Sequence, residues 1–170
     1  MAILSYSMSV NVATAIASEL AAAVAAETFT LDPTVRRGYV QDRDLQLEEI
    51  AALRIDVQAS DCDAEIASRE AIVYTCRTDI AVREKFAQSE RETSTGEIKT
   101  SEIDARLVLM QQLLEYFARD RDTDLTGRRL TDMDGAIFEE VEFRPQYYPA
   151  HLRDNGQFTG IISVVYKVYV

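Results

Sequence analysis

Two stretches of the chain repeat apolar residues every three or four positions, the spacing that predicts a helix with one buried face. The first runs from about Ser9 to Glu27 and is rich in alanine, which favours a helix and close packing. Its inner positions are Val12, Ile16, Leu20 and Val24. The second runs from about Ser101 to Arg119, and Ser101 with Asp104 predicts a capping box at its start. Its inner positions are Ile103, Leu107, Met110, Leu114 and Phe117.

Four other stretches alternate apolar and polar residues, as strands with one buried face do. They are Leu53 to Ser60, Ala71 to about Phe86, Ala136 to Tyr148 and Phe158 to Val170. The last stretch is the most apolar, with Ile162, Val164 and Tyr166 on one side. Such a strand would be an aggregation hazard as an exposed edge. We therefore expect it to lie centrally, to be covered, or to pair with another chain.

The segments between these elements are polar or broken by proline and glycine. Phe29 to Val40 is expected to be an extended arm, over about residues 28–41. Asp44 to Ala52 is expected to be a short acidic turn or helix, and Asp61 to Arg69 a polar loop. Gln88 to Lys99 has little apolar surface to bury, so we expect a mobile polar loop over about residues 88–99.

The expected order of elements is α-β-β-α-β-β, with the arm after the first helix. It predicts a single α+β domain over residues 1–170, with two helices packed on one face of a single, mainly antiparallel sheet. The other face of this sheet is mixed, because Val73, Ile161, Val165 and Tyr169 lie among its polar residues. That face is a candidate contact surface between subunits, and a simply solvated face is the alternative.

Composition and charge exclude several classes of function and location for this domain. The chain has 170 residues, 47% of them hydrophobic, which suits one domain with its own core. Its 18 basic and 29 acidic residues give a formal charge of −11, which opposes binding to phosphate backbones. We expect no membrane span, since no apolar run of about 18 residues lacks a strongly polar residue, and no signal peptide. Cys62 and Cys76 make no disulfide framework, Cys76 is expected to be a small buried hydrophobe, and a reducing cytosolic setting fits best.

Candidate catalytic chemistry is sparse. The single histidine, His151, has no nucleophile elbow to serve, although a pairing with one of the cysteines stays open. The run Asp120 to Asp124 alternates carboxylates like the start of a calcium loop, but Leu125 and Thr131 stand where glycine and glutamate are needed. No glycine-rich phosphate-binding motif occurs. We therefore predict that the protein is not an enzyme and uses no metal and no cofactor.

The order and spacing of these segments resemble those of the tail-terminator (tail-completion) proteins of long-tailed bacteriophages. The resemblance covers nearly the whole chain, from the alanine-rich helix to the closing strand. The segments that carry it are Arg36-Arg37-Gly38-Tyr39-Val40, Asp44 to Glu49 before Leu53 to Val57, Ser68-Arg69 before Ile72-Val73-Tyr74, and His151-Leu152-Arg153 before Phe158 to Tyr166.

This resemblance implies a structural virion protein, assembled in the host cytoplasm, that forms a ring, commonly of six subunits. The ring would cap the tail tube, end its polymerisation and offer a surface for joining the head. Its partners would be further copies of itself, the tail-tube protein and a neck or head-completion protein. DNA would pass without specific binding, because a hexamer carries about six times the negative charge of one chain. The candidate interface residues are Arg36, Arg37 and Tyr39 in the arm, Glu90, Arg91, Glu92 and Glu97 in the polar loop, and Arg77 and Arg83 on the sheet.

Three alternatives remain at this point. A neck protein that joins the head connector to the tail would have the same general organisation. An acidic inhibitor that mimics DNA belongs to another class, and its support is the stretch Gln41 to Glu70, with nine acids against three arginines. A small α+β enzyme would need a pocket that gathers His151, a cysteine or paired acids.

Overall fold

One five-stranded sheet, in the order β1-β2-β3-β7-β6, forms the centre of the molecule. The structure, a computed structural model, describes residues 7–39, 51–120 and 125–170. Neighbouring strands of the sheet are antiparallel except β1 and β2, which run parallel. The strands are β1 (Thr34–Arg37), β2 (Arg54–Ile66), β3 (Ile72–Lys85), β6 (Ala136–Phe143) and β7 (Gln157–Tyr169).

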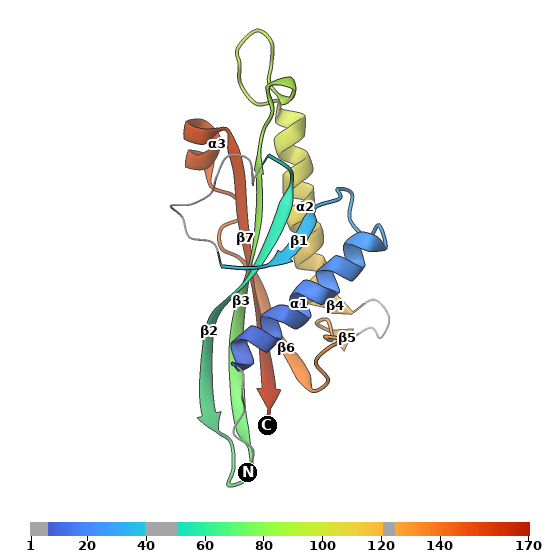
Figure 1. Ribbon diagram of the computed structural model, residues 1–170, viewed down its shortest axis with the longest axis vertical. Helices are drawn as coiled ribbons and strands as arrows, with labels where there is room; N and C mark the ends of the chain where they lie inside the picture. Colours follow the sequence, from blue (N-terminus) through green and yellow to red (C-terminus); the bar gives the residue numbers. More distant parts are fainter. Residues whose placement is uncertain (1–6, 40–50, 121–124) are drawn as a thin grey trace.

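Two long helices, α1 (Met8–Ala25) and α2 (Thr100–Ala118), cover one face of this sheet (Figure 1). Helix α1 contacts β1, β2 and β3, whereas α2 contacts β6 and β7. Residues paired across strands share a face, so Val57, Ile80 and Ile162 form one row beneath the helices, and all three are fully buried. The predicted α+β fold, with two helices on one face of a mainly antiparallel sheet, is confirmed.

Strand β7 lies between β3 and β6, which confirms the expectation of a central position for the most apolar strand. Its Ile162, Val164 and Tyr166 side chains are fully buried on the helix face. On the opposite face Val165 is also buried, while Tyr169 is 54% exposed near the end of the strand. The mixed face predicted from the sequence therefore keeps only part of its apolar residues at the surface.

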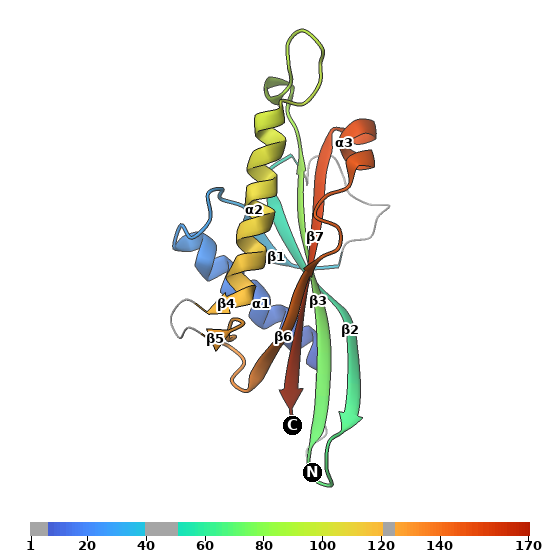
Figure 2. The same cartoon turned by 180° about the vertical axis from the view of Figure 1, so that it is seen from behind.

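The molecule is elongated along its strands, as the front and back views show (Figures 1 and 2). The β2–β3 hairpin forms one end, and the segment 88–99, which follows β3, projects at the other end beyond the start of α2. Smaller elements complete the fold. They are the 3-10 helix η1 (Gln88–Glu90), the two-stranded sheet of β4 (Arg119–Asp120) and β5 (Leu125–Thr126), and helix α3 (Pro149–Asn155).

The structure refines one prediction for the first half of the chain and contradicts another. Within the predicted extended arm, Thr34–Arg37 pairs with Arg54–Val57 as strand β1, so this part of the arm belongs to the sheet of its own subunit. The polar loop expected from Asp61 is instead the outer half of β2, which pairs with β3 as far as Ile66 opposite Ile72. Polar residues are compatible with this part of β2 because they occupy alternate positions along an exposed hairpin. Residues 40–41 of the arm and 44–50 of the acidic turn lie outside the described residues.

The two cysteines also differ from expectation. Cys62 of β2 lies directly opposite Cys76 of β3, and the two side chains form a disulfide. The sequence pattern predicts only a small buried hydrophobe at Cys76, because the first strand that it predicts ends at Ser60 and does not reach Cys62. The disulfide links two strands that the sheet already holds side by side.

Helix α2 is rotated relative to its predicted stripe, and it lacks the predicted capping box. The buried residues are Arg106, Leu109, Met110, Leu113 and Phe117, so only Met110 and Phe117 of the predicted stripe are fully inside. The helix begins at Thr100 after Lys99, with no side-chain cap. Helix α3 was not predicted, although Pro149 at its first turn and Gly156 in the left-handed conformation after it are typical helix boundaries.

Helix α1 has the length and composition that would suit a membrane span. In the structure half of that helix is buried. The side chains of Val12, Ile16 and Leu20 are fully enclosed in the core. Packing against the sheet thus accounts for its apolar character.

Candidate interaction surfaces

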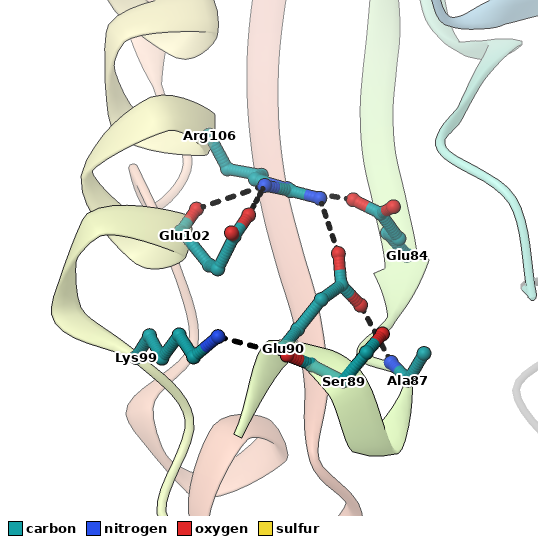
Figure 3. A network of polar contacts seen from close by, with 7 residues as sticks. All are labelled: Glu84, Ala87, Ser89, Glu90, Lys99, Glu102 and Arg106. Atoms are coloured by element: carbon teal, nitrogen blue, oxygen red, sulfur yellow. Dashed lines mark hydrogen bonds and ion pairs between the residues drawn. The ribbon is translucent and has the colours of Figure 1, made fainter. Parts of the chain in front are cut away.

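Arg106 fixes the base of the projecting segment 88–99 (Figure 3). Its guanidinium donates hydrogen bonds to the carboxylates of Glu84 at 2.7 Å, Glu90 at 3.1 Å and Glu102. These acids come from the end of β3, from η1 and from the first turn of α2, and Arg106 itself is only 6% exposed. Burial lowers the pKa of Arg106, but the bonds to Glu84 and Glu102 outweigh it and raise that pKa, so the guanidinium keeps its charge.

Further bonds order the backbone of the same segment. The Glu90 carboxylate accepts from the backbone N–H of Ala87 at 2.6 Å, and the Lys99 ammonium donates to the Ser89 carbonyl at 2.9 Å. Arg91 pairs with Ile98 in an isolated antiparallel bridge. The segment predicted as a mobile polar loop is therefore a small hairpin on a charged base.

The four predicted interface residues of this segment divide into two kinds. Glu90 belongs to the base, and the Arg91 guanidinium donates to the Gly96 carbonyl and lies against Gly156 after α3. Glu92 and Glu97 lie at the exposed tip, where the Glu92 N–H donates to the Glu97 carbonyl at 2.7 Å. The tip, residues 92–97, is thus an acidic surface presented on a fixed support.

Strand β1 places the other predicted arm residues on one edge of the sheet. The Arg36 side chain is 47% exposed and donates to Asp56, which also accepts from Arg54 at 2.9 Å. The Arg37 guanidinium lies 4.7 Å from the ring centroid of Tyr39 and donates to its hydroxyl at 3.0 Å. Tyr39 is 63% exposed, so this end of the strand presents a cation and an aromatic ring together.

The two arginines predicted on the sheet face are not equivalent. Arg77 is partly exposed and donates to Glu142 at 2.9 Å and Glu140 at 3.3 Å, both from β6. The hydrogen bonds from Arg77 and Arg144 lower the pKa of Glu142. Arg83 is only 5% exposed, so its side chain is part of the interior and is not an open contact surface.

Sequence reasoning missed Glu19 as an internal anchor. This residue of α1 is 5% exposed, and its carboxylate accepts hydrogen bonds from Arg128, from Tyr116 and from the N–H and hydroxyl of Thr131. Burial alone would raise the pKa of Glu19, but the bonds from Thr131 and Arg128 outweigh it, so the pKa lies below its usual range. A single acid within an alanine-rich helix was the available signal.

The candidate catalytic groups do not converge. His151 Nδ1 lies 3.0 Å from the Thr159 hydroxyl, and the ring stacks on Tyr148, while both cysteines are tied in the disulfide. A hollow between the ends of α1 and α2 contains one carboxylate, Glu115, and neither His151 nor a cysteine. Within residues 7–39, 51–120 and 125–170, no three metal-ligating side chains are gathered to hold an ion. Residues 121–124 of the calcium-like run lie outside the described residues.

The arrangement defines a small acidic α+β protein with exposed charged groups at, among other places, the tip of segment 88–99, the β1 edge and the outer strand β6. No protein-family model matches the chain, and no curated protein is similar to it at a significant level.

Proposed function

We propose that this protein is a ring-forming virion component that caps the tail tube of a long-tailed bacteriophage and ends its polymerisation. The proposal rests on the resemblance in element order, and the two long helices and the strands β2, β3, β6 and β7 follow one another in the order used for that resemblance. On this proposal the protein acts by recognition, and no covalent bond is made or broken.

The observation that best supports the proposal is the fixed acidic projection at one end of the sheet. A surface that is already ordered before its partner arrives binds more tightly, because ordering a loop on binding costs affinity. Arg106 and its three carboxylates supply that order, and the tip with Glu92 and Glu97 lies beyond them. We assign this tip to the contact with the tail tube.

The charge of the chain supports the same proposal. Each subunit has a formal charge of −11, so a six-membered ring would carry about −66. Like charges would keep the DNA phosphates from adhering to such a ring while the genome passes through it. The net charge thus suits a channel through which DNA passes better than it suits a nucleic-acid binding site.

Electron microscopy of tails assembled without this protein tests the proposal. Terminators stop growth, so their absence should give tubes that are much longer than normal. Tails of normal length that lack heads would instead indicate the neck-joining role. Tails that are normal and joined to heads would contradict both roles.

A second class of function has one specific observation in its favour. Asp61, Asp63 and Glu65 lie at alternate positions of β2 and are exposed, so their side chains form a row on one face, with about 6.6 Å between successive members. A row of this kind could imitate phosphates toward a DNA-binding protein. Only this reading predicts that the purified protein inhibits a nuclease and that Asp61→Asn with Asp63→Asn abolishes the inhibition.

A further inference from the structure

We infer that neighbouring subunits join edge to edge, with β1 of one subunit adding to β6 of the next as an antiparallel strand. The inference rests on the proposed function, because it requires a ring. It goes further by naming the two surfaces that meet and the side chains that match across them.

The five-stranded sheet ends at β1 on one side and at β6 on the other. An edge strand offers backbone N–H and C=O groups to another strand, and a closed ring is one way to satisfy them. Each edge strand has one sign of charge. Strand β1 contains Arg36 and Arg37 and no acid, whereas β6 contains Glu139, Glu140 and Glu142 and no basic residue.

The two edges also have compatible directions. Three antiparallel pairings and one parallel pairing separate β6 from β1, so the two edge strands run in opposite directions. A ring in which the sheet continues from subunit to subunit keeps the direction and the face of every strand. The joint between β6 and the next β1 is therefore antiparallel, with the helix faces on the same side.

Side chains match on both faces of this joint. Arg36 lies on the face away from the helices, where it contacts Asp56, and Glu140 and Glu142 lie on that same face, where they contact Arg77. Val35 and Arg37 lie on the helix face, as do the partly buried Val141 and Phe143 of β6. The joint would thus pair opposite charges on one face and bring Val35 against apolar side chains on the other.

The same features oppose the symmetric alternatives. Pairing two β6 edges would bring three glutamates against three glutamates, and pairing two β1 edges would bring arginines together. Like charges directly opposite each other destabilise a sheet, so the head-to-tail joint is favoured over a two-fold dimer.

Cysteine cross-linking tests the joint in the assembled protein. If Arg36 faces Glu140, an antiparallel register places Thr34 opposite Glu142; if Arg36 faces Glu142, it places Thr34 opposite Arg144. Two double variants cover both registers: Thr34→Cys with Glu142→Cys, and Thr34→Cys with Arg144→Cys. The matched control is Thr34→Cys with Arg153→Cys, because Arg153 is exposed on α3 and lies outside both edge strands.

The inference predicts that one of the two test variants gives a ladder of covalent oligomers up to the closed ring, and that the control gives none. In the unaltered protein, backbone amides of β1 and β6 should also exchange hydrogen about tenfold more slowly in the ring than in the monomer. Closed rings with no ladder and no change in exchange would overturn the inference and leave the proposed function standing. The absence of any closed oligomer, free or on tubes, would remove the proposed function as well.

Discussion

At the scale of single residues, a few buried charged groups position the elements of this fold. Glu19 connects α1 to Tyr116 of α2 and to Arg128 and Thr131, which follow the small second sheet. A buried carboxylate is stabilising only when its oxygens are well bonded, and Glu19 meets that condition. The alanine pattern predicted the helix, whereas the partners of Glu19 lie about a hundred residues away and no local signal reveals them.

The bonds to Glu19 predict a pH-dependent stability. Its pKa is lower in the folded state than in the unfolded chain, so the carboxylate stabilises the fold above the unfolded pKa and loses this contribution as pH falls through the folded pKa. Glu19→Gln should lower the free energy of unfolding by about 2 kcal/mol at neutral pH. The penalty should shrink below about pH 4. Urea unfolding at several pH values measures both effects.

The control for this experiment is Glu115→Gln, because Glu115 is an exposed acid of α2 that bonds only to neighbouring Gln111 among the described contacts. Its effect should stay within about 0.5 kcal/mol. A penalty for Glu19→Gln that stays the same from neutral to acid pH would show that the charge of Glu19 has no part in stability.

Gly160 of β7 is a second residue with a definite prediction. A Cβ at this position would lie 2.4 Å from the Gln146 carbonyl and 2.8 Å from Met110, so Gly160→Ala forces the backbone or α2 to shift. We expect a loss of about 1–3 kcal/mol in the free energy of unfolding. Gly38→Ala has no atom within 4 Å of the added Cβ and should change thermal unfolding little. Equal effects of the two substitutions would contradict the packing described here.

At the scale of elements, hydropathy predicted which segments are helices and strands better than it predicted their facing sides. The stripe of α2 was misplaced because Arg106, a charged residue, occupies an inward position that an apolar template skips. Its spacing of four residues from Glu102 was the one local hint of an ion pair. Strand β2 was cut short because its outer half is polar, and only its pairing with β3 shows it to be a strand.

Arg106 is predicted to hold the projection in place. Arg106→Met removes the cation and leaves Glu84, Glu90 and Glu102 facing one another, so we expect a loss of about 3 kcal/mol in stability. Amides of segment 88–99 should exchange hydrogen faster in the variant. Arg106→Lys should not restore the wild-type exchange, because an ammonium cannot reach three acids with the geometry of a guanidinium.

Arg153→Met is the matched control, since Arg153 pairs with Asp154 in an exposed position on α3. It should leave both stability and the exchange of segment 88–99 unchanged. Wild-type exchange in the Arg106→Met protein would mean that the projection is held by its backbone bonds alone.

At the scale of the whole molecule, the sequence predicted the fold class, the central position of the last strand and one-sided coverage by helices. The candidate surfaces were predicted less well. Arg83 is buried and Glu90 is structural, because charge in a sequence does not distinguish a group bonded inside the fold from one at the surface. Glu92, Glu97, Arg36 and Tyr39 remain exposed, and Arg37 is partly exposed. Assembly is proposed to depend on these surfaces.

The growth of tail tubes in the presence of this protein tests the central claim most directly. Purified tail-tube protein of the same virion is allowed to polymerise with and without the chain, and tube lengths are measured by electron microscopy. A variant in which Asn-Gly replaces residues 92–97 keeps the base at Arg91 and Ile98 and serves as the comparison. We predict that the unaltered protein stops tube growth when it is added at about one ring per tube, an amount far smaller than that of the tail-tube protein. We predict that the shortened variant does not stop growth. Tubes that grow to the same lengths with and without the unaltered protein would contradict the account.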